Sequence, residues 1–154
     1  MVLEHDFKKF PELSNQQIQE LQFQSPHIQI EEDFEATVVK VHDGDTVTLT
    51  ANFRDFKFPL RMVGLDAPEM NAGGEEARDW LKGKILNAKV LVTIDKKNRV
   101  DKYGRLLGRI LHGGMDVGEE EVHLGLAPPF DERGVEIPNI NKELSPKKVG
   151  LEAF

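Results

Sequence analysis

Short alternating runs of apolar and polar residues dominate the middle of the chain. Such runs are typical of strands with one buried face, and here they are rich in β-branched residues. They predict five strands, at residues 34–41, 46–51, 56–65, 89–95 and 105–112. Because the first three strands are joined by turns of about four residues, they favour an antiparallel meander.

Glycine and proline refine these strand predictions. Gly44 follows Asp43 in the first turn, and an Asp-Gly pair suits the positive φ of a tight hairpin. Pro59 lies within the third predicted strand. Because proline has no N–H to donate, it favours an edge position or a bulge there.

Apolar residues at helical spacing predict a helix from Glu75 onward. Its apolar face holds Ala77, Trp80, Leu81, Ile85 and Ala88. Asp116 followed by Glu119 is typical of a capped helix start and predicts a short helix over residues 117–127. A similar signal predicts a third short helix over residues 15–23.

Five strands with a helix between the third and the fourth predict an α+β, mainly β fold. The expected architecture is a five-stranded OB-fold-like barrel with two or three helices. We expect residues 34–127 to form this domain, after an N-terminal lead-in over residues 1–33 that contains the short helix. Residues 128–154 are expected to form an irregular C-terminal extension that packs on the domain.

Length and composition narrow the class of protein. A chain of 154 residues has room for one domain with its own core. No apolar run approaches the ~20 residues that span a membrane, and the first ten residues lack the apolar stretch of a secretory signal. The chain has no cysteine, which excludes disulfides and fits a reducing compartment. We therefore expect a cytoplasmic protein without a membrane partner.

The net charge of −7 argues against a nucleic-acid binder that works through overall positive charge. The charge is uneven, because residues 34–112 carry a net +3 whereas residues 1–33 and 113–154 each carry a net −5. The most basic stretch contains Lys96, Lys97, Arg99, Lys102, Arg105 and Arg109. This stretch fits either a solvated turn or a nucleic-acid contact, and the pattern alone does not separate the two.

Acidic residues and arginines gather in and after the predicted meander. They are Asp43, Asp45, Arg61, Asp66 and Glu69. Each motif alone has an ordinary structural interpretation, such as a hairpin turn or a loop whose Asp accepts backbone hydrogen bonds. Together they combine the hard oxygen ligands of a divalent cation with a guanidinium that binds phosphate. A second arginine in the segment 101–105 strengthens the hypothesis of a metal-dependent phosphodiesterase.

Four ordered motifs resemble those of the staphylococcal nuclease (thermonuclease) family. They are VHDGDTVTL, PLRMVGLDAPE, DKYGR and EEEVHLGLA, and the similarity covers about residues 34–127. The resemblance implies an OB-like barrel, one catalytic Ca²⁺ and an endonuclease that hydrolyses DNA and RNA to 3′-phosphate ends. We also expect a monomer that prefers single-stranded or locally open nucleic acid.

The resemblance implies a cation site built from oxygen donors. Asp45 and Asp66 would be the carboxylate ligands of Ca²⁺, and the backbone carbonyl of Ala67 a third ligand. Asp43 would hold water beside the cation. Glu69 would orient or deprotonate the attacking water.

The resemblance also implies a set of phosphate contacts. Arg61 and Arg105 would clamp the scissile phosphate, because a planar guanidinium can donate to two phosphate oxygens at once. Lys102 and Tyr103 would contact a terminal phosphate of the bound nucleotide.

A second class of function fits the same fold. A catalytically inactive OB-fold module would bind nucleic acid or a peptide without cleaving it. Such modules typically lose the acidic ligands or the arginines. This chain keeps both, which favours the enzyme.

Overall fold

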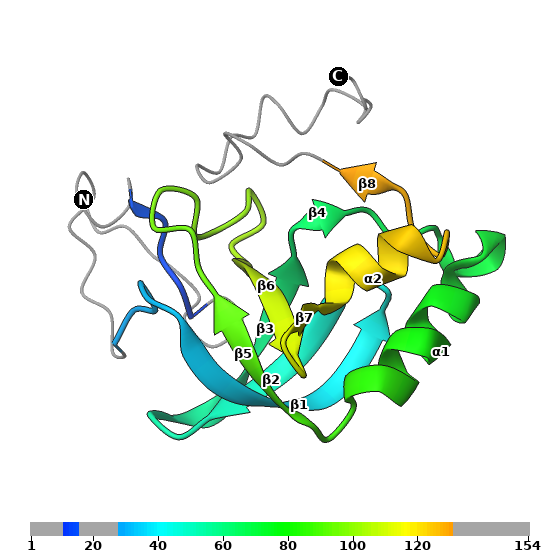
Figure 1. Cartoon of the computed structure of the whole chain (residues 1–154). Coiled ribbons are helices and arrows are strands. Elements are labelled where there is room, and N and C mark those ends of the chain that lie inside the picture. Colours follow the sequence, from blue (N-terminus) through cyan, green and yellow to red (C-terminus); the bar gives the residue numbers. More distant parts are fainter. Residues whose placement is uncertain (1–10, 16–27, 131–154) are drawn as a thin grey trace.

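A computed structural model describes residues 11–15 and 28–130 of the chain (Figure 1). The meander consists of β1 (Phe34–Asp43), β2 (Thr46–Ala51) and β3 (Arg54–Met62), paired in order and antiparallel. Its strands alternate between inward apolar and outward polar side chains, which fixes their register because a one-residue slip would expose the core face.

The barrel closes through two later strands. β5 (Lys89–Thr93) pairs antiparallel with β1, and β6 (Leu106–His112) pairs antiparallel with β5. β6 then pairs with β3 in parallel, and this contact completes the ring. The prediction of a closed five-stranded barrel is therefore confirmed.

Three two-residue strands complete the sheets. β7 (Met115–Asp116) pairs antiparallel with the end of β6, and β4 (Gly64–Leu65) pairs with β8 (Pro129–Phe130) in a separate two-stranded sheet. The single strand expected over residues 56–65 is wrong, because the chain leaves β3 after Met62. The edge position expected for Pro59 is confirmed, since the first part of β3 pairs only with β2 and the pairing with β6 begins at Leu60.

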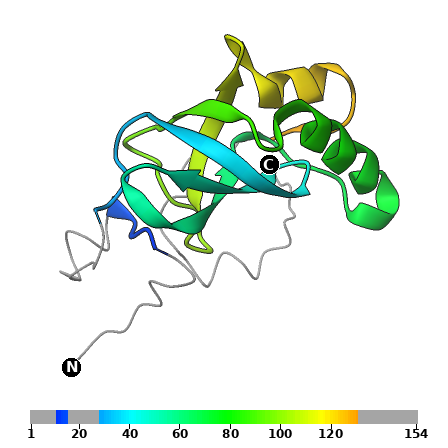
Figure 2. The same ribbon diagram turned by 90° about the horizontal axis from the view of Figure 1, so that it is seen from below.

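Two α-helices lie in the described part of the chain, α1 (Gly74–Ile85) and α2 (Val117–His123), and Figure 2 shows them side by side at one end of the barrel. An ion pair of 3.4 Å from Lys84 Nζ to Glu120 Oε2 joins them. No helix among the described residues is long and apolar enough to cross a membrane.

The helix ends follow local signals. Asp116 Oδ1 accepts a hydrogen bond of 3.1 Å from the Glu119 N–H, so the predicted cap of α2 is confirmed. The predicted end of this helix at residue 127 is wrong, because Gly125 takes a φ of +76° and the helix stops at His123. The helix predicted over 15–23 and the extension beyond Phe130 lie largely outside the described residues.

The barrel interior is apolar and continuous with the buried face of α1. Its fully buried residues include Val38, Val47, Leu49, Leu60, Val92 and Ile110. Ala77, Leu81 and Ile85 of α1 are also buried, as the helical spacing predicted. Trp80 is only partly buried and packs at the margin of the core. Placing Ala88 on the helix was wrong, because α1 ends at Ile85.

The N-terminal segment 11–15 lies against the barrel through buried charge. Glu12 is 1% exposed, and its two carboxylate oxygens contact Arg54 Nη2 at 2.6 Å and Arg99 Nη2 at 2.9 Å. Arg99 also donates to the carbonyls of Ile30 and Leu13 at 2.7 and 2.9 Å. Placing Arg99 in a basic surface stretch was therefore wrong, since these contacts bury it and neutralise its charge.

Candidate active site

Arg61 lies between two aspartates at the end of the meander where β1 turns into β2. Arg61 Nη2 lies 3.4 Å from Asp45 Oδ2 and 3.5 Å from Asp66 Oδ1. Asp45 is 6% exposed, whereas the Asp66 side chain is 59% exposed. The three predicted residues thus form one cluster with a buried and a solvent-facing side.

The β1–β2 turn and the loop after β4 together fix Asp45. Its Oδ1 accepts from Thr46 Oγ1 at 2.9 Å, and its Oδ2 accepts from the Ala67 N–H at 2.7 Å. The Asp45 N–H in turn donates to Asp43 Oδ1 at 3.0 Å. Burial raises the pKa of Asp45 above its ordinary value, while the Arg61 guanidinium beside it acts in the lowering direction.

Arg61 is held by the chain that wraps around it. Its Nη1 donates to the carbonyl of Leu65 at 3.0 Å and to that of Met62. The strand expected over residues 56–65 ends at Met62, and the chain curls back at Val63, so that Asp66 follows β4. This curl aims the Asp66 carboxylate at the guanidinium.

The segment 101–105 is organised by a buried aspartate that sequence reasoning had counted only as a charge. Asp101 is 3% exposed, and its Oδ1 accepts from the N–H groups of Tyr103 and Arg105 at 2.9 and 2.8 Å. Its Oδ2 accepts from Arg105 Nε at 2.8 Å. An Asp that precedes two turn residues often bonds to the backbone two positions later, and this signal could have identified it.

Arg61 lies in β3 and Arg105 directly precedes β6, the two strands that meet where the barrel closes. Arg61 of β3 lies opposite Leu107 of β6, and Arg105 lies two positions before Leu107. Arg105 itself precedes β6 (Leu106–His112), so strand pairing does not fix its direction, and its ion pair among the described residues is with Asp101 rather than with the Asp45–Arg61–Asp66 cluster. Tyr103 is 47% exposed, with the Lys102 ammonium and the Arg105 guanidinium each 5.4 Å from its ring centroid.

Glu69 lies at the start of the short 3₁₀ helix η2 (Met70–Ala72) with its side chain exposed. Among the described residues it forms no ion pair with the aspartate–arginine cluster. The loop that carries it is held tightly, because a Cβ on Gly74 would stand 2.4 Å from the Pro68 carbonyl oxygen and 2.6 Å from that of Glu69. Gly74 therefore fixes the backbone of Glu69 against the start of α1.

Gly44 has a different role from the expected one. It lies in the turn between β1 and β2, as predicted, but it does not take the positive φ that was expected of it. A Cβ there would lie 2.4 Å from Glu121 Oε2, 2.8 Å from Ala77 Cβ and 3.1 Å from Ala67 Cβ. A glycine is needed because the turn packs directly onto α1, α2 and the loop after β4.

Glu121 is the acidic residue that sequence reasoning missed. It lies in α2, is 0% exposed, and neither carboxylate oxygen has a hydrogen-bond partner within the described structure. Burial, followed by the charges of Asp45 and Asp43, raises the pKa of Glu121 to about 8. Its place in a run of three glutamates indicates a solvated helix face, so the sequence offered no signal for its burial.

The donor chemistry of this cluster fits a hard divalent cation. No three acidic or histidine side chains form a ready-made cation site in the described residues. However, the available donors are carboxylate and carbonyl oxygens, which suit Ca²⁺ or Mg²⁺ rather than Zn²⁺. Behind Asp45, the buried Glu121 carboxyl has no hydrogen-bond partner among the described residues, and burial together with the charges of Asp45 and Asp43 opposes its ionisation.

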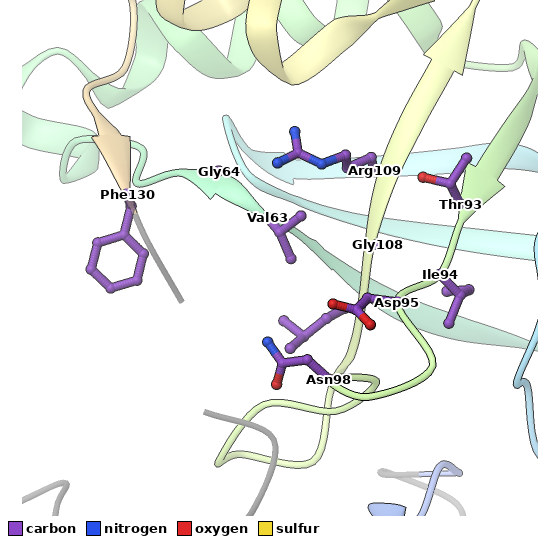
Figure 3. A pocket seen from close by; sticks show the side chains of 10 residues that line it. Val63, Gly64, Thr93, Ile94, Asp95, Asn98, Gly108, Arg109 and Phe130 are labelled. Atoms are coloured by element: carbon purple, nitrogen blue, oxygen red, sulfur yellow. The ribbon is translucent and has the colours of Figure 1, made fainter. Parts of the chain in front are cut away.

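A separate cavity of about 300 Å³ lies on the outer face of the barrel between β4, β5, β6 and β8 (Figure 3). It is lined by Val63, Gly64, Thr93, Ile94, Asp95, Asn98, Leu107, Gly108, Arg109 and Phe130. None of the predicted site residues lines it. Arg109 at its wall is paired with Asp116 at 3.1 Å.

Comparison with known proteins gives one family and several relatives. The family model described as staphylococcal nuclease homologue matches residues 59–151. The chain is 34% identical over 97 residues to a thermonuclease of Staphylococcus hyicus, covering 58% of this chain and 56% of that protein. It is 38% identical over 77 residues to a micrococcal nuclease of Shigella flexneri, covering 49% and 41%. It is 33% identical over 98 residues to endonuclease YncB of Bacillus subtilis, covering 59% and 46%. The chain thus spans about half the length of these relatives.

Proposed function

The chain belongs to the family of staphylococcal nuclease homologues, and on that basis we propose that it is a calcium-dependent endonuclease acting on DNA and RNA. It would leave 3′-phosphate ends. The observation that carries the proposal is the contact of Arg61 with both Asp45 and Asp66. A guanidinium shared by two carboxylates brings a phosphate-binding group and cation-binding groups to one place.

In this proposal the oxygen donors hold Ca²⁺ and the arginines hold the phosphate. Asp45, Asp66 and the carbonyl of Ala67 would bind the cation, and Asp43 would hold water beside it. The cation, when bound, supplies positive charge opposite the phosphate oxygens as negative charge grows on them. The Asp45 carboxylate suits this task because hydrogen bonds from Thr46 and Ala67 fix its orientation.

The remaining residues handle the phosphate and the proton. Arg61 and Arg105 donate to the phosphate oxygens, and Lys102 and Tyr103 contact a terminal phosphate. Glu69 accepts a proton from the attacking water. The new P–O bond forms as the P–O5′ bond breaks, and the departing 5′ oxygen takes a proton from water. The phosphate then remains on the 3′ side.

The substrate is proposed to be single-stranded or locally open nucleic acid. Tyr103, which is exposed and contacts the side chains of Lys102 and Arg105, supports this preference because an unpaired base can stack on an exposed ring. We further propose that residues 34–127 form the catalytic domain and that the protein acts as a monomer.

The proposal is tested by nicking of a supercoiled plasmid with the full chain. We expect cleavage in Ca²⁺, none in excess chelator, and slower cleavage in Mg²⁺, because Ca²⁺ tolerates irregular oxygen ligation better than Mg²⁺. End-labelling of the products should identify 3′-phosphates. Equal cleavage with and without chelator would contradict the metal dependence, and binding without any cleavage would favour the inactive OB-fold module.

Glu69→Gln tests the proposed proton acceptor within the same assay. A neutral amide cannot take the proton, so the rate should fall by about 10²–10⁴. Ca²⁺ binding and the melting temperature should stay close to those of the unmodified protein, since the Glu69 side chain is exposed. Glu76→Gln, at an exposed position in the first turn of α1, is the control and should keep full activity.

A further inference from the structure

Among the described residues, Glu121 has no hydrogen-bond donor that explains a glutamate at this position. It is fully buried in α2, and both carboxylate oxygens lack a hydrogen-bond donor among the described residues. A buried carboxylate without a partner is strongly unfavourable, whereas an apolar side chain of similar size would fill the same space without that cost. The energetic balance of the fold therefore does not account for a glutamate here.

The surroundings of Glu121 connect it to the candidate active site. Its Oε2 lies against the backbone of Gly44, where even a methyl group would stand 2.4 Å away. The charges that act on it are those of Asp43, Asp45 and Arg61. Glu121 thus points at the back of the turn that presents Asp45, while the front of that turn faces Arg61 and Asp66.

We propose that Glu121 is a further carboxylate of the cation site, which strengthens cation binding from behind the Asp43–Asp45 turn without ligating the cation directly. This inference rests on the proposed cation-dependent function. Glu121 adds a fourth carboxyl group to those of Asp43, Asp45 and Asp66 near the guanidinium of Arg61. A divalent cation would offset this excess and favour the ionised form of each carboxylate.

The proposal makes two opposite demands on one side chain. Removing the Glu121 charge should weaken cation binding, because carboxylates that support a metal site from outside its ligands typically affect affinity by about 10–100-fold. Replacing the side chain with an apolar one should leave the cation-free protein at least as stable as before, since a buried carboxyl group without a hydrogen-bond partner among the described residues disappears. A purely structural glutamate would do the reverse.

Calorimetric titration of the full chain with CaCl₂ tests the first demand. For Glu121→Gln, which keeps the size of the side chain, we expect the Kd for Ca²⁺ to rise about 10–100-fold. Glu119→Gln is the matched control on the same helix, because its side chain is 75% exposed, and its Kd should stay within about twofold. A Kd for Glu121→Gln equal to that of the control would overturn the proposal.

Thermal unfolding in chelator tests the second demand. Glu121→Leu should melt at the same temperature as the unmodified protein or higher. A lower melting temperature in both Glu121→Leu and Glu121→Gln, or failure of both to fold, would assign the residue to the fold and overturn the proposal. If the unmodified protein binds no Ca²⁺, the proposed function fails as well. If it binds Ca²⁺ and the variants bind equally, only the role of Glu121 fails.

Discussion

Two clusters of buried charge in the described part of the chain, one at the N-terminal segment and one at the candidate active site, are built in opposite ways. The N-terminal cluster has one carboxylate, that of Glu12, between the guanidinium groups of Arg54 and Arg99, and backbone carbonyls accept further hydrogen bonds from both arginines. In the candidate active site one guanidinium, that of Arg61, faces Asp45 and Asp66, with the unpaired Glu121 behind them.

The two clusters differ in how far their polar and charged atoms already have partners within the protein. Almost every polar atom of the N-terminal cluster has a partner; Arg54 Nη1 is the exception among the described residues. Such a cluster holds a segment in place and calls for no ligand. The active-site cluster keeps more negative charge than the protein itself compensates, which is typical of a site completed by a cation. Buried charge alone therefore identifies neither role, but the state of its partners separates the two.

The largest expected effect comes from breaking the N-terminal cluster. Glu12→Ala leaves two buried guanidinium groups without their carboxylate and should lower the free energy of unfolding by about 3–5 kcal/mol. Chemical denaturation measures this loss. Below the unfolding transition, cleavage activity should persist. Glu32→Gln, at an exposed position just before β1, is the control, and a loss below about 1 kcal/mol for Glu12→Ala would show that solvent replaces the lost contacts.

The second effect comes from breaking the active-site cluster at its centre. Arg61→Lys keeps the positive charge but loses the fork that donates to two oxygens, so the cleavage rate should fall by about 10²–10³. Initial rates at saturating substrate measure it. Binding of uncleaved nucleic acid should change much less, because the phosphate gains charge on the way to the transition state. A rate within a few-fold of the original would remove Arg61 from the proposed mechanism.

The smallest expected effect comes from a change in packing at the turn between β1 and β2. Gly44→Ala places a methyl group against Glu121, Ala77 and Ala67, and overpacking of this kind should cost about 1–3 kcal/mol. Gly83→Ala is the matched control, because a Cβ at this position of α1 meets nothing within 4 Å. Since alanine favours helix more than glycine does, Gly83→Ala should stabilise the protein by up to about 1 kcal/mol. Equal shifts in melting temperature for the two variants would contradict the packing described at Gly44.

The strands and α1 could be predicted because their pattern is local. Val47 and Leu49 alternate with threonines, and only one register buries them both. Family membership was also predictable, since the motifs that carry it are contiguous. The roles of the individual site residues stay predictions, although the structure brings Asp45, Arg61, Asp66 and Ala67 into contact.

What could not be predicted depends on contacts between distant parts of the chain. Arg99 lies in a run of basic residues, and nothing near it in the sequence indicates that Glu12 covers it. Glu121 lies among glutamates that are typical of a solvated helix, and its burial follows from where α2 packs. The turn at Gly44 illustrates the same limit, because a glycine can serve φ or space and the sequence does not distinguish them.

The seam that closes the barrel has a consequence for how activity would be lost. It pairs three residues of β3 with three of β6, and these strands are joined only by a long stretch of intervening chain. Closing so long a loop costs more entropy than forming the hairpins of the meander. A brief local opening of this seam would leave Asp45 and Arg61 together in the meander while Arg105 moves away with β6. Heat or denaturant would then abolish the proposed cleavage activity under conditions that leave most of the strands intact.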